Sequence, residues 1–165
     1  MAINRDSSYE LDEKDRLLLS IIQQNAEISL SELGEKINLT RMAVSNRIRS
    51  LKKAGVIEGT FVKVNGAKVG QDYVMITRIT CTPKGYEQDK IAEEISKIPG
   101  VQSIYQVFGS FDMMMIARAK DKTAGKELVR EIAKIHGVRN TVTFIPHTVV
   151  RESLFVETMP IKGAK

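Results

Sequence analysis

Apolar residues in the first third of the chain recur at helical spacing, which predicts three short helices sharing one small core. The first helix is expected over residues 12–24, and the second begins after Ser29, which has the spacing of a capping box with Glu32. The third runs from Thr40, whose hydroxyl can cap it, to Gly55, which stops it. Its inward stripe consists of Val44, Ile48 and Leu51.

The outward face of the third helix is cationic. Residues 40–54 carry five basic side chains and no acidic one. One set of side chains lies opposite the buried stripe and suits the edges of bases, and a second set flanks it. The first set is Met42, Ser45, Asn46 and Arg49; the flanking set is Arg41, Arg47, Lys52 and Lys53, with Thr40 at the helix start. The pattern is typical of a helix-turn-helix DNA-binding domain, with a solvated basic helix face as the plainer alternative.

The second half of the chain contains an internal repeat. Residues 94–101, EISKIPGV, and residues 131–138, EIAKIHGV, are identical at six of eight positions. Each copy ends an amphipathic helix and leads into an apolar, β-rich segment. With further strands expected at residues 73–82 and 113–119, the order is βαββαβ, a ferredoxin-like arrangement with two helices over one face of an antiparallel sheet. Apolar groups on both faces of the strands predict that another subunit covers the open face.

These patterns together predict an α+β chain of two domains. Residues 1–65 form the helix-turn-helix domain and end in a strand suggested by Ile57, Phe61 and Val62, which starts a wing or tethers the next domain. Residues 66–165 form the βαββαβ domain with a C-terminal tail. The tail, VVRESLFVETMP, is expected to add an edge strand that covers a neighbouring subunit.

Composition narrows the function. The net charge of +5 favours an anionic partner, and no catalytic constellation stands out, so neither an enzyme nor a cofactor is predicted. Cys81 has no cysteine partner, and His136 and His147 lack the spacing of metal ligands. No apolar run reaches membrane-spanning length, and the start of the chain lacks the apolar core of a signal peptide. The sequence therefore predicts a cytoplasmic protein.

The run from residue 11 to about residue 64 resembles the N-terminal half of the leucine-responsive (Lrp/AsnC) family of transcription regulators. The matching positions include Leu11-Asp12, Asp15, Ala43-Val44, Arg47-Ile48 and Gly55-Val56-Ile57. The second half is similar to that family's regulatory domain, on the internal repeat and the turn Gly109-Ser110-Phe111-Asp112. The resemblance implies a homodimer formed by packing sheets together, and further association into an octamer.

The resemblance also implies that this turn lies beside a pocket for a free amino acid. Gly109 and Ser110 can present backbone N–H groups to a carboxylate, and Asp112 can pair with an ammonium. The alternative is a plain hairpin turn that needs the glycine and is capped by the aspartate. Weaker candidates for the pocket are Tyr105, Phe108, Thr141 and Thr143. Phe108 departs from the family, which more often has a small or hydroxylated residue there.

The sequence thus predicts a regulator that binds specific sites on double-stranded DNA and changes this binding when a small metabolite, an amino acid, occupies the second domain. The alternative is an oligomeric amino-acid sensor that regulates an enzyme or partner protein without binding DNA. The uncompensated charge of the third helix argues against the alternative.

Overall fold

The computed structural model describes residues 9–82 and 85–159 of the 165-residue chain. The chain divides into two compact units. The first unit runs up to Val62 and also takes in the segment from Glu152 onward, whereas the second is Lys63–Arg151. The tail therefore groups with the helical unit, although the sequence pattern predicts it as part of the sheet domain. No helix in the described ranges is long and apolar enough to cross a membrane.

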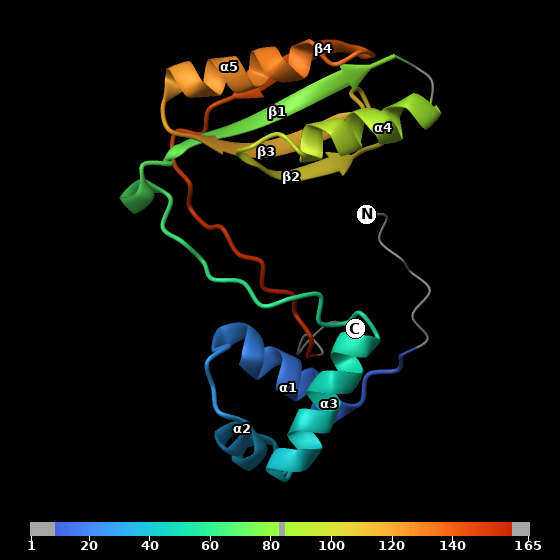
Figure 1. Cartoon of the computed structure of the whole chain (residues 1–165), viewed down its shortest axis with the longest axis vertical. Helices are drawn as coiled ribbons and strands as arrows, with labels where there is room; N and C mark the ends of the chain where they lie inside the picture. Colours follow the sequence, from blue (N-terminus) through green and yellow to red (C-terminus); the bar gives the residue numbers. More distant parts are fainter. Residues whose placement is uncertain (1–8, 83–84, 160–165) are drawn as a thin grey trace, which may run out of the picture. The chain divides into compact units, whose positions relative to one another are not determined.

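The first unit is built from three helices (Figure 1), which are α1 (Glu13–Gln24), α2 (Leu30–Ile37) and α3 (Arg41–Lys53). Their apolar faces form one core, as the helical spacing predicts. The predicted stripe of α3 is inside, because Val44 and Leu51 are fully buried and Ile48 packs against the same cluster. Their fully or nearly fully buried partners from α1 and α2 are Leu18, Leu33 and Ile37.

Each helix of this unit begins at a side chain that accepts a backbone hydrogen bond. The hydroxyl of Ser29 accepts from the N–H of Glu32 at 3.1 Å, and the hydroxyl of Thr40 accepts from the N–H of Ala43 at 3.2 Å. The full reciprocal capping box lies at Asp12 and Asp15 rather than at Ser29. These caps fix where the helices start, and hence which side chains α3 presents.

The C-terminus of α3 closes in the way its glycine predicts. Gly55 has a φ of +73°, a left-handed conformation that costs glycine little. Its N–H donates to the carbonyl of Lys52 at 3.1 Å, and the N–H of Val56 donates to the carbonyl of Leu51 at 2.9 Å. This pair of bonds is the Schellman arrangement, which satisfies the last carbonyls of the helix.

The second unit has the predicted βαββαβ order (Figure 1). After a short 3-10 turn, η1 (Ala67–Val69), its elements are β1 (Tyr73–Cys81), α4 (Gly85–Ser96), β2 (Val101–Gln106), β3 (Met113–Ala119), α5 (Lys122–Ala133) and β4 (Val138–Phe144). The strands form one antiparallel sheet in the order β2-β3-β1-β4. Strands β2 and β4 are therefore its two edges.

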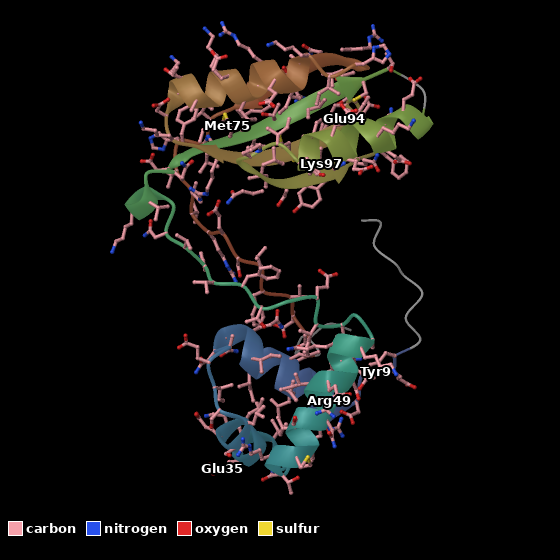
Figure 2. The ribbon with its side chains drawn as sticks, in the orientation of Figure 1. Tyr9, Glu35, Arg49, Met75, Glu94 and Lys97 are labelled. Atoms are coloured by element: carbon pink, nitrogen blue, oxygen red, sulfur yellow. The ribbon has the colours of Figure 1, made fainter. Side chains whose placement is uncertain are left out.

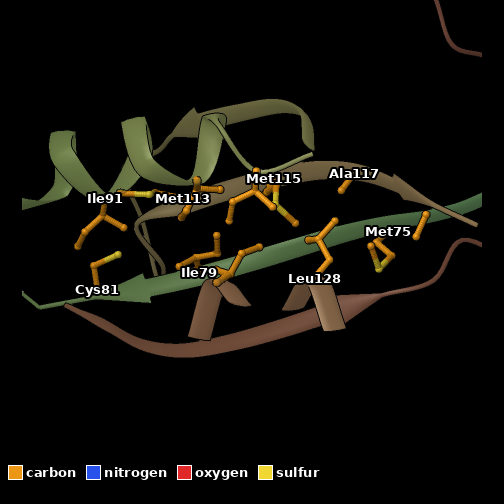
Figure 3. Close-up of a cluster of buried hydrophobic side chains, with 12 residues drawn as sticks. Met75, Ile79, Cys81, Ile91, Met113, Met115, Ala117 and Leu128 are labelled. Carbon is orange, nitrogen blue, oxygen red and sulfur yellow. The ribbon is translucent and has the colours of Figure 1, made fainter. Parts of the chain in front are cut away.

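The core of this unit lies between the sheet and its two helices (Figure 3). Alternate residues of the central strands point into it, with Ile79 of β1 and Met113 and Met115 of β3 fully buried. Ile95 of α4 and Ile132 of α5 belong to the same cluster and are equally buried. Since both helices contribute to one cluster, they cover the same face of the sheet and leave the other face open.

The internal repeat has a structural reason. Gly100 and Gly137, its two glycines, both have a φ of +93°. The carbonyl of Gly100 accepts from the N–H of Arg118, in β3, at 2.8 Å, and that of Gly137 accepts from the N–H of Thr82, just after β1, at 2.9 Å. A Cβ on Gly100 would lie 2.6 Å from the carbonyl oxygen of Arg118, so a side chain there would clash as well as strain the backbone. The repeat therefore encodes two equivalent helix-to-strand corners.

Two of the expected strands do not form. The segment after α3 is an extended connection without strand pairing, and Phe61 and Val62 are 78% and 88% exposed. A strand needs a partner for its ladder, and none is present for this segment in the described residues. The tail likewise forms no edge strand; its described part bonds to α1 instead.

Candidate DNA interface and ligand-binding turn

The face of α3 opposite its buried stripe is open to solvent. Met42 is 70% exposed, and Asn46 and Arg49 are exposed as well, while Ser45 is half-buried. Figure 2 shows Arg49 on this helix. An amide, a guanidinium and a methionine on one face can bond to base edges and contact a thymine methyl. The structure thus brings together all four side chains predicted to face the bases.

Four of the predicted cations are exposed and unpaired within the described residues, which are Arg41, Arg49, Lys52 and Lys53. No ion pair described within the chain has to break before these side chains contact a phosphate. Thr40 caps the helix through its hydroxyl while remaining exposed. These side chains can therefore bind a polyanion without breaking existing contacts.

Arg47 differs from the other cations of α3. Its guanidinium lies 2.6 Å from an oxygen of Asp12 and 2.7 Å from an oxygen of Asp15, at the start of α1. The side chain of Asp15 is only 3% exposed, and these bonds raise the pKa of Arg47 above its ordinary value. The structure therefore gives Arg47 an internal partner, whereas the sequence pattern predicts a side chain that flanks the DNA contact.

The carboxylates bound by Arg47 are also held from other directions. Asp15 accepts from the N–H of Asp12 at 3.3 Å and from the hydroxyl of Tyr9 at 3.4 Å. The carboxylate of Asp12 accepts from the N–H of Asp15 at 2.7 Å. This bond lowers the pKa of Asp12, and the guanidinium of Arg47 lowers it further. Arg47 therefore fastens α3 to the capped end of α1 and fixes the angle between the two helices.

The turn between α2 and α3 depends on Gly34, which sequence reasoning did not single out. A Cβ on Gly34 would lie 2.5 Å from the carbonyl oxygen of Leu39, which is too close. The N–H of Leu39 in turn donates to the carbonyl of Gly34 at 2.9 Å. A glycine inside a short helix, six residues before the N-cap Thr40 of the next helix, was the available signal.

The turn between β2 and β3 carries the predicted ligand-binding residues. Phe108 and Ser110 are exposed, and Gly109 has a φ of +151°, which other residues rarely adopt. No atom would crowd a Cβ on Gly109, so the glycine is there for its backbone conformation. Within the described residues, the N–H groups of Gly109 and Ser110 have no acceptor. They are available for an anionic group.

Asp112, at the end of this turn, is already bonded inside the unit. Its carboxylate accepts from the N–H of Cys81 at 2.7 Å and from the side-chain amide of Gln88 at 3.0 Å. Burial raises the pKa of the Cys81 thiol, and the charge of Asp112 adds to that rise. Asp112 thus joins the turn to the end of β1 and the start of α4, which favours the capping alternative over a free partner for an ammonium.

The remaining predicted ligand residues lie apart within one chain. Tyr105, on the edge strand β2, pairs with Met114 and faces the open side of the sheet. Thr141 and Thr143 are on the opposite edge strand, β4, and share the helix-covered face with Ile79 and Thr77. The hydroxyl of Thr143 bonds to that of Thr77 at 3.0 Å. One chain alone therefore does not assemble these side chains around a single ligand.

Arg78 is a feature of the open sheet face that sequence reasoning missed. Its guanidinium lies 5.4 Å from the ring centre of Phe111, in the turn, and 5.2 Å from that of Phe144, in β4. Its Nε is buried without a hydrogen-bond partner among the described residues. Two aromatic rings thus hold this cation on the open face of the sheet. The sequence signal for this feature was a single arginine within the apolar-rich run VMITRITC, residues 74–81.

Family models match both units. Residues 11–58 match a model described as winged helix-turn-helix DNA-binding, and residues 74–153 match the Lrp/AsnC ligand binding domain. An uncharacterised HTH-type transcriptional regulator of Pyrococcus furiosus is 32% identical over 146 residues, 87% of this chain and 97% of that protein. The HTH-type transcriptional regulator LrpA of Pyrococcus horikoshii is 27% identical over 144 residues, 87% of this chain and 99% of that protein.

Solved structures share the whole architecture. A transcriptional regulator from Neisseria meningitidis, in complex with L-methionine, matches with a TM-score of 0.82 at 20% identity and covers 93% of this chain and 98% of its own. The leucine response regulatory protein of Mycobacterium tuberculosis matches with a TM-score of 0.77 at 27% identity, over 86% of this chain and 96% of its own. The order of domains is thus the same in these proteins.

Proposed function

We propose, because this chain belongs to the Lrp/AsnC family of transcription regulators, that it binds its DNA sites as a homodimer or a larger assembly, up to an octamer. We further propose that a free amino acid bound to the second unit changes this DNA binding. Such a regulator works in the cytoplasm, as the sequence predicts. The observation that carries the proposal is the face of α3 on which Arg41, Arg49, Lys52 and Lys53 are exposed and have no ion-pair partner among the described residues.

Different side chains on the face of α3 are suited to contact the bases and the phosphates. Asn46 and Arg49 lie opposite the buried stripe, where side chains reach base edges, and can each bond to a base in two places. Lys52 and Lys53 follow in the last turn of the helix, where they meet the phosphate backbone instead. Arg41, in the first turn, is a further phosphate contact.

The test is a selection of duplexes from a random library with the full chain, followed by titration of the selected duplex at rising salt. With three phosphate contacts per subunit and two subunits, affinity should fall by about 10³-fold or more between about 50 and 200 mM salt. Each neutralised phosphate releases counterions, and salt opposes that release. An affinity that does not change with salt contradicts DNA binding through this face.

The open sheet face supports the proposed dimer. Its exposed residues are mainly apolar or aromatic, with Tyr105, Val142 and Phe144 being 54%, 36% and 49% exposed. Ile76, Met114 and Ile116 are half-buried on the same face. A second copy of this sheet would remove these side chains from water. Light scattering on the full chain measures the assembly, and a stable monomer at micromolar concentration contradicts it.

The turn after β2 supports an amino-acid ligand. The N–H groups of Gly109 and Ser110, which have no acceptor in the described part of the chain, suit a carboxylate. The Neisseria regulator of the same fold was solved with L-methionine. A thermal-shift screen of the twenty amino acids tests this, since a ligand that binds only the folded chain raises its melting temperature. L-Methionine is the first candidate. No shift with any amino acid contradicts the proposed effector class.

A further inference from the structure

The C-terminal tail is part of the DNA-binding unit. We call residues 152–159 the strap. The side-chain amide of Gln23, near the end of α1, bonds to Val156 of the strap twice. Its oxygen accepts from the N–H of Val156 at 2.8 Å, and its nitrogen donates to the carbonyl of Val156 at 2.9 Å. The Gln23 side chain thus bonds to both the N–H and the carbonyl of one strap residue, as a residue of a neighbouring antiparallel strand would.

A second contact lies two turns earlier on α1. The hydroxyl of Thr158 donates to the carbonyl of Arg16 at 3.0 Å, and the guanidinium of Arg16 donates to the carbonyl of Thr158 at 3.4 Å. Arg16 and Gln23 are seven residues apart, so they lie on one face of the helix. Alternate residues of the strap, Val156 and Thr158, bond to that face. The strap is therefore docked along α1 at two points.

The connectivity of the chain makes this contact important. The chain leaves the DNA-binding unit after Val62 and returns to it after Arg151. The first connection follows the C-terminus of α3, whereas the second reaches α1. The strap contacts at Val156 and Thr158 lie beyond residue 153, where the match to the ligand binding domain ends. Neither matched domain therefore accounts for them.

We propose that the strap is a second tether, which limits the orientations of the DNA-binding unit and so fixes the spacing of the two DNA half-sites. A unit attached by one flexible connection can take many orientations. A second attachment at a separate point excludes most of these orientations, because only those within reach of both connections remain possible. This inference rests on the proposed binding of DNA by a dimer. The alternative is that the strap only adds stability to α1.

The first measurement tests the docking without DNA. Hydrogen exchange at the amide of Val156 is followed in the full chain, in Gln23→Ala and in Gln24→Ala. Gln24 is the neighbouring, exposed glutamine and makes no described side-chain bond, so it is the matched control. Exchange should be about tenfold faster in Gln23→Ala than in the full chain and unchanged in Gln24→Ala. Equal rates in all three proteins overturn the docking.

The second measurement tests the tether. The selected duplex is compared with one in which half a helical turn, about five base pairs, is inserted between the half-sites. Inserted DNA should lower the affinity of the full chain and of Gln24→Ala by at least about tenfold, because it rotates one half-site to the other side of the duplex. In the double variant Gln23→Ala, Thr158→Val, and in a chain ending at Arg151, the loss should shrink to about threefold or less.

The outcomes separate the tether from its alternative and from the proposed function. If both strap variants keep the spacing penalty of the full chain, the strap serves stability alone and the tether is overturned. If the selection returns no duplex, the proposed function fails and the tether fails with it. A smaller penalty, with affinity for the original duplex kept within about threefold, supports the tether. Circular dichroism on each variant shows that the helices are intact.

Discussion

The polar side chains of α3 and those of the turn after β2 are engaged in opposite ways. On α3, Arg49 and Lys53 are exposed and unpaired within the described residues. In the turn, the carboxylate of Asp112 already accepts two hydrogen bonds from its own unit. The first surface is ready for a ligand, whereas the charged group of the second maintains the shape of the turn. The residue type alone does not show which of these roles a charged side chain has.

Arg47 brings the same contrast onto a single helix. It is one of five cations on α3, but its guanidinium is bonded to Asp12 and Asp15 of α1. Arg49, two residues later, has no such partner among the described residues. This difference between Arg47 and Arg49 is tested by removing each charge in turn and measuring the stability and the DNA binding of each variant separately.

The largest effect is expected from Arg47→Ala. The substitution leaves the carboxylate of Asp15 buried without its cation, and should lower the free energy of unfolding of the DNA-binding unit by about 3 kcal/mol. Hydrogen exchange of the slowest amides in α1–α3 measures the stability of this unit alone. Arg49→Ala is the matched control and should change that stability by less than about 0.5 kcal/mol.

If Arg47 instead contacts phosphate, Arg47→Ala would leave the stability intact. The slope of log affinity against log salt would then fall by about one for each lost contact. That result would restore the role that the sequence predicts for Arg47.

The next effect is expected from Asp112→Ala, which leaves the N–H of the buried Cys81 without an acceptor. We expect the ligand-binding unit to lose about 2 kcal/mol, since an unsatisfied buried donor keeps its desolvation cost. Exchange of the slowest amides in β1 and β3 measures this loss. Asp112→Asn keeps an oxygen that can accept from Cys81 and should cost less than about 1 kcal/mol.

Asp112→Asn also tests the role of the charge. If its melting temperature rises with L-methionine as much as that of the unchanged chain, Asp112 serves the turn alone. Loss of the rise in an assembly of unchanged mass would show that the carboxylate pairs with the ammonium of the ligand.

The sequence predicted best those features that depend on local signals. Ser29, Thr40 and Gly55 mark helix ends through bonds spanning three to five residues, and the structure confirms each end. The repeat predicted two equivalent corners, which Gly100 and Gly137 form with the same φ. Short-range hydrogen bonds are encoded by neighbours in the chain, so spacing is enough to find them.

The features that the sequence did not predict depend on distant partners. Arg47 and Asp12 are 35 residues apart, Asp112 and Gln88 are 24 apart, and Gln23 and Val156 are 133 apart. Spacing along the chain carries no signal for such pairs. The missing strand at Phe61 has the same cause, because the apolar residues of this segment indicate a strand but do not show whether another strand lies beside it.

A smaller effect is expected for base recognition. Asn46→Ala should weaken binding to the selected duplex by at least about 1 kcal/mol, while binding to a scrambled duplex changes little, since its amide is expected to bond to a base. Lys53→Ala, one helix turn beyond the predicted base contacts, should weaken binding to both duplexes by the same factor. Gel-shift titrations of both duplexes give the ratio. If Asn46→Ala weakens both equally, the base-reading face of α3 is assigned wrongly.

The smallest effect is a pH dependence at the start of α1. The N–H of Asp15 and the guanidinium of Arg47 hold the pKa of Asp12 below its ordinary value. A carboxyl with a lowered folded-state pKa contributes stability above its unfolded pKa, near about 3.9, and loses it as the pH falls through the folded value. Asp12→Asn keeps a capping oxygen but has no charge to titrate.

The stability of the DNA-binding unit is therefore measured for both proteins between about pH 6 and pH 2.5, from the unfolding of its helices in urea. The difference between them should be constant at the upper end and shrink below about pH 4, because only the unchanged chain gains a proton at this position as it acidifies. The effect is small because the side chain of Asp12 is half-exposed, with 50% of its surface accessible. A difference that is the same at every pH would mean that the charge of Asp12 adds nothing to the cap, and that Arg47 holds α3 through Asp15 alone.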